Sequence, residues 1–342
     1  MRIRIRSLAL LSCLCAASCQ SQPSAPPTAV VGAATPTSSA PVTVASESSC
    51  FQAREILPFA FSQDAQSILL RAESGVQSVE LATGRELLFV PAPASVVTAA
   101  LSPDGQTMAW SFQDGQVQIM RLADQGVLAT FSGHPDPVYD LSFDSGGDRL
   151  FSASHDGTVR IWDLAGKELG AIQPGGEVLG FGVSPDGAQL ATIPSDGPVQ
   201  VWDISQATKL KDLGGTSGYD TSDARFSTDG LYLAADLATG LYLWKVSDGQ
   251  LLWNAVTNTM AAAFSPDGKY LAYTDIDDGN SVVLAPPDAS SVIRTIDRMA
   301  APIWEMFFSP DSSLLLATDG TEIRVWETPG GALRYVGRLE CP

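Results

Sequence analysis

The sequence predicts an all-β fold that is assembled from one repeated unit. A ten-residue pattern such as "FSPDGKYLAY" recurs about every 41 residues, and short runs of alternating apolar and polar residues surround each copy. The copies open with an apolar residue at Phe61, Leu101, Phe143, Val183, Phe226, Phe264 and Phe308. The intervals between these seven positions are 40, 42, 40, 43, 38 and 44 residues. Self-similarity at such a period indicates a repeat architecture.

Each copy contains the same predicted elements in the same order. An alternating strand leads into Ser-Pro-Asp-Gly, a second strand such as "AQLAT" follows, and a second Asp-Gly opens a third strand, as in "SDGPVQVWD". A looser fourth strand, such as "GKELGAI", completes the unit. Glycine tolerates the positive φ of a tight hairpin, and proline fixes φ at the start of the turn. The recurring Ser-Pro-Asp-Gly is therefore interpreted as a hairpin turn and not as a catalytic motif.

The third strands carry a family resemblance. "SASHDGTVRIWDL" and "SDGPVQVWDI" resemble the WD-repeat family, and "DGTEIRVWE" and "LATGLYLWKV" are weaker copies. The resemblance implies a seven-bladed β-propeller with four antiparallel strands in each blade. It covers residues 51–341, a span of 291 residues, and seven periods need about 287. The predicted propeller domain is residues 50–342.

The resemblance also implies a structural hydrogen-bond tetrad in the third blade. The family's His, Ser or Thr, Asp and Trp positions correspond to His134, Ser152, Asp156 and Trp162. The other copies depart from this pattern, since the Trp position holds Met120 in the second blade and Leu284 in the sixth. The Gly-His pair that precedes the tetrad does not occur in any other copy.

Residues 1–18 predict a lipoprotein-type signal peptide. Three arginines precede the apolar run "LALLSCLCAA", which is shorter than the ~20 residues of a membrane-spanning helix. The run ends in "AASC", which resembles a bacterial lipobox and implies that Cys19 is lipidated, although Ala16 stands where the family usually has Leu. Ordinary signal cleavage near the same place is the alternative. Either outcome takes the mature chain out of the cytoplasm.

Residues 19–49 predict a lipid-anchor cysteine followed by a disordered tether. Ser, Thr, Ala and Pro dominate this segment, and it contains no apolar periodicity. Such a composition buries too little surface to offset the chain entropy lost on folding. A flexible segment of this length has a root-mean-square reach of roughly 30 Å.

Two cysteines stand at the two ends of the predicted ring. Cys50 precedes Phe61 by 11 residues, and Cys341 follows Trp326 by 15 residues. Aligned on the repeat, both positions fall in the same loop between blades, within about three residues of each other. Outside the cytoplasm a disulfide between them would form and persist. Two free thiols remain the alternative.

The mouth of the predicted channel is the candidate binding site. Asp140, Asp223 and Glu305 lie three residues before their anchors, at the starts of the innermost strands. They could form an acidic rim able to hold a basic peptide or a cation. Tyr139 and Trp304 precede two of these acids and are candidate binding anchors. The alternative is that the acids and aromatics pack between the blades.

The charge and the scarcity of histidine exclude several classes of function. The net charge is −18, from 20 basic and 38 acidic residues, which disfavours nucleic acid and anionic lipid as partners. The only two histidines are His134 and His155. A calcium loop at "TDIDDGNS" is disfavoured, because Asp275, Asp277 and Asp278 break the required alternation. We expect no catalytic residues, no cofactor and no metal.

The function predicted from these features is that of an extracytoplasmic, membrane-anchored scaffold for protein–protein interaction at a bacterial cell envelope. The anchor would hold a monomeric propeller on the outer side of the cytoplasmic membrane or in the outer membrane. The partner is an envelope or secreted protein that the sequence does not identify. The alternative is a small-molecule- or metal-binding propeller enzyme, similar to lactonases or other hydrolases, that uses the channel mouth.

Overall fold

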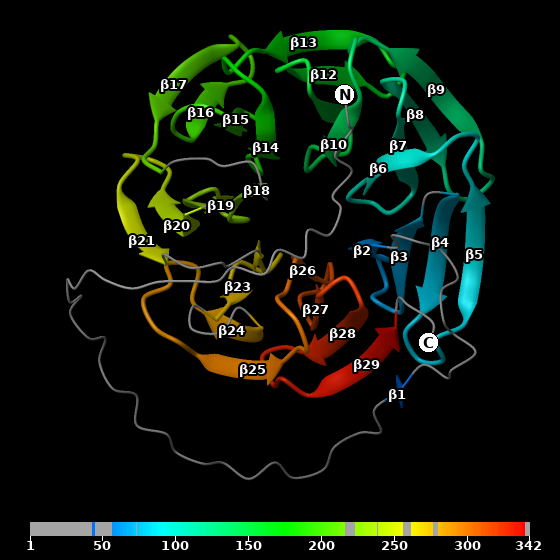
Figure 1. Cartoon of the computed structure of the whole chain (residues 1–342), viewed down its shortest axis with the longest axis vertical. Coiled ribbons are helices and arrows are strands. Elements are labelled where there is room, and N and C mark those ends of the chain that lie inside the picture. The colour runs from blue at the N-terminus through cyan, green and yellow to red at the C-terminus, as the bar shows by residue number, and fades with distance from the viewer. Residues whose placement is uncertain are drawn as a thin grey trace, which may run out of the picture. The chain divides into compact units, whose positions relative to one another are not determined.

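Seven antiparallel sheets of four strands stand around a common axis, which confirms the predicted seven-bladed β-propeller (Figure 1). The computed structural model describes residues 43–44, 57–72, 74–215, 223–237, 239–255, 261–275 and 280–338. All of them belong to one of two units of the chain, Pro41–Pro342. None of these residues forms a helix long and apolar enough to cross a bilayer.

In every blade four consecutive strands follow the chain order from the axis outward, and the last sheet carries β1 (Thr43–Val44) as a fifth strand at its outer edge. The innermost strands are β2 (Leu57–Phe61), β6 (Val96–Leu101), β10 (Val138–Phe143), β14 (Val178–Val183), β18 (Asp223–Phe226), β22 (Ala262–Phe264) and β26 (Glu305–Phe308). The second strands are β3 (Ser67–Ala72), β7 (Thr107–Phe112), β11 (Arg149–Ser154), β15 (Gln189–Pro194), β19 (Tyr232–Leu237), β23 (Leu271–Thr274) and β27 (Leu314–Thr318).

The two outer layers of each sheet complete the blades. The third strands are β4 (Gly75–Glu80), β8 (Gln116–Arg121), β12 (Val159–Asp163), β16 (Gln200–Asp203), β20 (Gly240–Lys245), β24 (Ser281–Ala285) and β28 (Glu322–Glu327). The outermost strands are β5 (Glu86–Pro91), β9 (Val127–Ser132), β13 (Glu168–Ile172), β17 (Thr208–Asp212), β21 (Leu251–Ala255), β25 (Arg294–Arg298) and β29 (Leu333–Arg338). Each predicted anchor residue is therefore the last residue of an innermost strand.

The recurring Ser-Pro-Asp-Gly forms the turn between the first and second strands. In the second blade Ser102 Oγ donates to Asp104 Oδ1 and accepts the N–H of Thr107, while Asp104 Oδ1 also accepts the N–H of Gln106. The fourth residue of the turn has a positive φ of 69° at Gly105, which glycine adopts without strain. The same side-chain bond recurs at 2.6–2.7 Å in the turns of five other blades. These contacts support the interpretation of the motif as a hairpin turn.

The turn of the third blade makes different contacts because its sequence departs from Ser-Pro-Asp-Gly. Asp144 stands in place of the serine, and its Oδ1 accepts the N–H groups of Asp148 and Arg149. Its Oδ2 pairs with the guanidinium of Arg149 at 2.8 Å. Arg149 also donates to the carbonyl of Gly187 in the next blade. The turns of neighbouring blades thus touch one another and lie on one face of the ring, which we call the turn face.

The core lies between neighbouring sheets and not in the centre of the ring. Trp162, for example, packs with Val117, Ile119 and Phe143, which belong to two adjacent blades. The second strands are buried almost throughout, whereas the outermost strands expose most of their residues. Antiparallel sheets with one solvated edge show this gradient when each sheet is covered on both flat sides by its neighbours.

The first and last blades close the ring by side-chain packing. Phe61 and Leu70 of the first blade share one apolar cluster with Val325 and Tyr335 of the last, and the rings of Phe61 and Phe307 meet edge to face at 6.3 Å. All four strands of the last blade, β26–β29, come from the C-terminal end of the chain. Among the described residues, the N-terminal segment therefore supplies none of these four strands.

A short N-terminal strand adds to this last blade. Residues Thr43–Val44 form β1, which pairs in parallel with the outer edge of β29. The register places Thr43 opposite Tyr335 and Val44 opposite Val336. Both residues fall within the segment predicted as a tether. The predicted signal peptide and all other tether residues lie outside the described residues.

One glycine marks the closest approach of two innermost strands. A Cβ built on Gly182 of β14 would lie 2.1 Å from the carbonyl oxygen of Ala224 in β18. Gly170 on the outermost strand β13 has open space at the same position. Neither residue has a positive φ, so the two differ in packing and not in backbone conformation.

We expect Gly182→Ala to destabilise the propeller by about 1–3 kcal/mol, the usual effect of overpacking a close backbone contact. Gly170→Ala is the matched control and should change the free energy of unfolding by less than about 0.5 kcal/mol, as surface substitutions usually do. Denaturant unfolding of the three proteins measures the difference. Equal midpoints for the two variants would contradict this packing.

Candidate functional site

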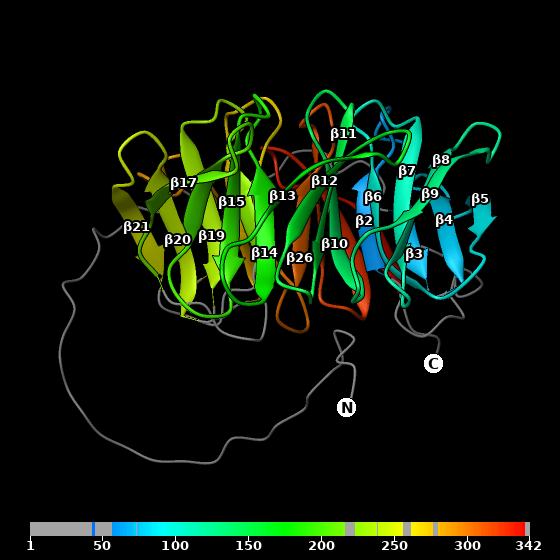
Figure 2. The same cartoon turned by 90° about the horizontal axis from the view of Figure 1, so that it is seen from above.

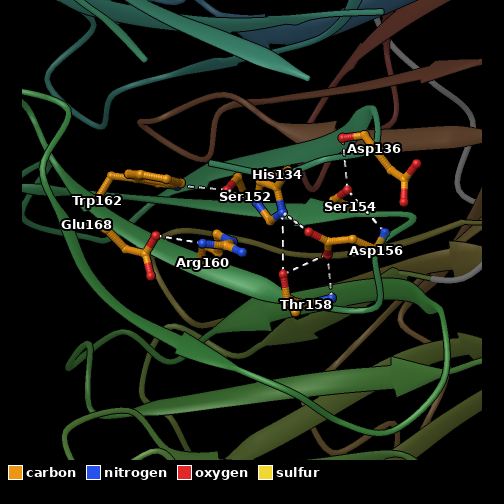
Figure 3. Close-up of polar contacts among 9 residues, drawn as sticks. All are labelled: His134, Asp136, Ser152, Ser154, Asp156, Thr158, Arg160, Trp162 and Glu168. Atoms are coloured by element: carbon orange, nitrogen blue, oxygen red, sulfur yellow. Dashed lines mark hydrogen bonds and ion pairs between the residues drawn. The ribbon is translucent and has the colours of Figure 1, made fainter. Parts of the chain in front are cut away.

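The third blade holds a continuous chain of side-chain hydrogen bonds (Figure 3). Trp162 Nε1 on β12 donates to Ser152 Oγ on β11 at 2.8 Å, and Ser152 Oγ lies 2.8 Å from His134 Nε2. His134 Nδ1 lies 2.8 Å from Asp156 Oδ2 in the turn between β11 and β12. Asp156 Oδ1 accepts the N–H and the hydroxyl of Thr158. The structure thus brings all four predicted tetrad residues together, and Thr158 is a fifth member that the sequence analysis did not single out.

Donor and acceptor capacity fixes the protons along this chain. The indole N–H can only donate, so Ser152 Oγ accepts it and gives its single proton to His134 Nε2. His134 Nδ1 then carries the remaining proton and donates to Asp156. Burial lowers the pKa of His134, although the hydrogen bond and the charge of Asp156 raise it. The imidazole is accordingly neutral.

The connectivity Asp156–His134–Ser152 is also that of a Ser-His-Asp catalytic triad. Its surroundings do not allow that chemistry, because Ser152 is fully buried and its oxygen already accepts the Trp162 N–H. Gly133 lets the loop lie directly on the indole, since a Cβ there would approach the ring to 2.3 Å. The network fixes the loop before β10 to the blade.

Part of the same network occurs in the fourth blade. Trp202 Nε1 donates to Thr192 Oγ1 at 3.0 Å, a contact that the sequence analysis missed. In both blades the tryptophan pairs across the strands with a leucine, and the hydroxyl residue follows that leucine by two positions. Trp244 and Trp326 have the same pairing, but Ala235 and Ala317 stand at the hydroxyl position. Within the described part of the chain, their buried indole N–H groups have no hydrogen-bond partner.

The face opposite the turn face is the one on which the innermost strands begin, and we call it the mouth face. Seen edge-on, the connections between strands gather on these two faces (Figure 2). Asp223 and Glu305 are the first residues of β18 and β26, and Asp140 is the third residue of β10. All three are partly exposed. The predicted acidic residues therefore come from three innermost strands around the axis.

An arginine that the sequence analysis missed lies among these acids. Arg225 Nε and Nη2 contact Asp223 Oδ2 at 2.8 and 2.6 Å, and 38% of the arginine side chain stays exposed. The charge of Asp223 raises the pKa of Arg225, burial opposes this, and the charges of Glu305 and Asp140 add to the rise. The strand alternation could have indicated it, since Arg225 stands two residues after Asp223 and so faces the same side.

Each of the two predicted aromatic anchors contacts the turn between the second and third strands of its own blade. The rings of Tyr139 and His155 lie 4.8 Å apart, and the ring of Trp304 covers Gly320, where a Cβ would approach it to 2.7 Å. Tyr139 also packs against the apolar cluster between the third and fourth blades. Burial, with the charges of Asp140, Glu177 and Asp156, raises the pKa of Tyr139 well above its usual range.

The other candidate residues from the sequence analysis either make structural contacts or lie outside the described residues. His155 contacts Glu177 across the boundary between the third and fourth blades. Among the described residues, no three His, Cys, Asp or Glu side chains converge as metal ligands would. Asp277 and Asp278 of the disfavoured calcium loop lie outside the described residues, as do Cys19, Cys50 and Cys341.

Comparison with known proteins agrees with this architecture. A family model described as "WD domain, G-beta repeat" matches residues 125–163. The matched segment runs from the outermost strand β9 of one blade through β10–β12 of the next, and it contains all four tetrad residues.

Several known proteins are similar to parts of the chain. The "Periodic tryptophan protein 2 homolog" of Schizosaccharomyces pombe is 34% identical over 143 residues, 39% of this chain and 15% of that protein. "COMPASS component SWD3" of Saccharomyces cerevisiae is 36% identical over 115 residues, which are 33% of this chain and 36% of that protein. "Apoptotic protease-activating factor 1" of Rattus norvegicus is 26% identical over 230 residues, which are 54% of this chain and 18% of that protein. The chain therefore spans about a third or less of these relatives.

We expect Ala317→Ser to stabilise the protein by about 1 kcal/mol, because it supplies the acceptor that the buried Trp326 N–H lacks. Ala272→Ser is a control for adding a hydroxyl at a buried site, since Ala272 is fully buried and its strand partner Leu284 offers no side-chain donor. Thermal unfolding should show a higher Tm for the first variant and a lower one for the second. A fall of Tm in both variants would contradict the assignment.

Proposed function

The chain is a WD-repeat β-propeller, and from this premise we propose that it is a protein-interaction scaffold whose mouth face binds a basic segment of another protein. The observation that carries the proposal is the charge of that face. Asp140, Asp223 and Glu305 lie on three innermost strands that border the axis, and Arg225 pairs with Asp223 at 2.6 Å. Opposite charges across an interface steer encounter and select partners.

The relatives support a scaffold more than a particular process. One of them is named as a component of COMPASS, and a part of an assembly acts through its contacts with other proteins. The relatives named above are eukaryotic, so they do not bear on the compartment. A fold of this kind hosts many functions, and the site has to specify which one applies.

We also propose a bacterial envelope location with lipid on Cys19. The support comes from the sequence of residues 1–19, with its arginines, its short apolar run and its small residues before the cysteine. In this proposal the segment between Cys19 and β1 tethers the propeller to the outer side of the cytoplasmic membrane or to the outer membrane.

A disulfide between Cys50 and Cys341 belongs to the same proposal. Its new support is the parallel pairing of β1 with β29, which places Val44 opposite Val336. Cys50 follows Val44 by six residues in the sequence, and Cys341 follows Val336 by five. The two thiols would lose two electrons and two protons to an oxidised dithiol protein of the envelope. The bond would covalently join the first and last blades.

The scaffold proposal predicts that neutralising the mouth face abolishes partner capture. Asp140→Asn combined with Glu305→Gln should lose the proteins that crosslink to the wild type in producing cells, because the attraction for basic segments falls. Glu86→Gln combined with Glu327→Gln removes the same charge near the turn face, at the start of β5 and the end of β28, and is the control. A partner that both double variants retain equally would exclude the mouth face as the binding surface.

The envelope proposal predicts the covalent state of the mature chain. Intact-mass analysis after thiol labelling should give a diacylglycerol-type mass on a chain that begins at Cys19, with no label on Cys50 or Cys341 until reduction. An unlipidated chain would exclude the anchor, and two thiols that react before reduction would exclude the disulfide. The two results are independent of each other and of the mouth face.

A further inference from the structure

The outer rim of the ring consists of the edges of the seven outermost strands (Figure 1). An open strand edge can pair with another chain, and proteins usually protect such edges with charged residues, proline or a covering segment. Charged residues occur in β5, β13, β17, β25 and β29. In addition, β5 ends in Pro91, and β1 covers the edge of β29. The strands β9 and β21 contain neither a charged residue nor a proline.

The edge of β9 is the longer of these two and is open to solvent. Its sequence is "VLATFS", with Val127 and Leu128 exposed by 55% and 39% and with Thr130 and Ser132 exposed as well. The sheet of the second blade ends at this strand, and within the described part of the chain no strand pairs with its outer side. The residues on both flanks of β9 are described, whereas residues 256–260 after β21 are not.

The last blade shows which kind of occupant such an edge accepts. In its sheet β29 has the place that β9 has in the second blade, and β1 adds to it as a fifth strand. Thr43 lies opposite Tyr335 in this pairing. The added strand is no part of the four-stranded blade that it joins, so an extended segment of chain has extended the sheet at its outer edge.

The inner side of β9 is held firmly by the rest of the ring. Phe131 packs in the apolar cluster between the second and third blades, and its ring centroid lies 4.5 Å from that of Trp162. Gln118 Nε2 on β8 donates to Thr130 Oγ1 at 3.2 Å. A strand that is already fixed loses little conformational freedom when a further strand adds to it, which lowers the cost of binding.

We propose that the outer edge of β9 is a docking site for an extended, uncharged segment of another protein, which adds to the second blade as a fifth strand. Main-chain hydrogen bonds supply the affinity, and contacts with Val127 and Leu128 supply selectivity. Apolar and β-branched residues suit this edge, because they make favourable cross-strand pairs and β9 offers them no charge. The site is separate from the mouth face and independent of the function proposed for that face.

The probe is a fluorescein-labelled peptide that alternates threonine and valine over six residues. The same peptide with N-methylated amides keeps its side chains but donates no main-chain hydrogen bonds, and is the control ligand. Fluorescence anisotropy compares the wild type with Val127→Lys combined with Leu128→Lys, or Leu128→Lys alone if the double variant does not fold. Thr208→Lys combined with Leu210→Lys is the matched control, because β17 already carries two lysines. Thermal unfolding establishes that each protein is folded.

We expect the wild type to bind the first peptide and not its N-methylated form. The β9 variant should bind about tenfold more weakly, because two cross-strand contacts are lost and two charges protect the edge. The β17 variant should match the wild type. Equal binding by the β9 variant, or no binding by the wild type, would overturn this site and leave the function of the mouth face untouched.

Sedimentation velocity tests a second copy of the chain as the occupant. We expect the wild type to sediment as a monomer at the concentrations of the binding experiment. A wild-type dimer that dissociates in the β9 variant but not in the β17 variant would assign the edge to self-association and overturn the partner proposed here.

Discussion

Apolar packing between neighbouring sheets holds the seven blades in a ring. Each four-stranded sheet has two flat faces that it cannot bury alone, and only a neighbour on each side covers them. A row of such sheets leaves two uncovered ends, so the first and last must meet. The cluster that joins Phe61 and Leu70 to Val325 and Tyr335 provides this last contact. Burying side chains of this size stabilises by about 1.5–3 kcal/mol each.

Polar networks then specify the connections that apolar packing leaves undetermined. The turn on each inner strand is fixed by a serine or aspartate that bonds its own backbone, and the loop before the third blade is fixed by the chain from Trp162 to Asp156. The indole groups of Trp244 and Trp326 show that the packing survives without such a chain. The tetrad is therefore a local device for one loop and not a requirement of the fold.

The mouth face differs from both of these regions because its polar groups remain partly exposed. Asp140, Asp223 and Glu305 start or nearly start inner strands, where no further strand covers them. Arg225 pairs with Asp223 in this group. Partly exposed charged side chains on one face suit the recognition of a charged protein segment, which is the role proposed for it. This electrostatic arrangement links the ring geometry to the proposed scaffold role.

The repeat spacing predicted the blade count, the strand order and the turn that ends every innermost strand, because local spacing and Asp-Gly chemistry act within each repeat. It also predicted four residues of the third-blade network, since a family pattern marks them. The folded chain was needed to show which distant side chains meet, and it revealed the Arg225–Asp223 pair, the Thr192–Trp202 bond and the pairing of β1 with β29. These contacts join residues of different strands and blades, and a one-dimensional repeat does not state which side chains a closed ring brings face to face.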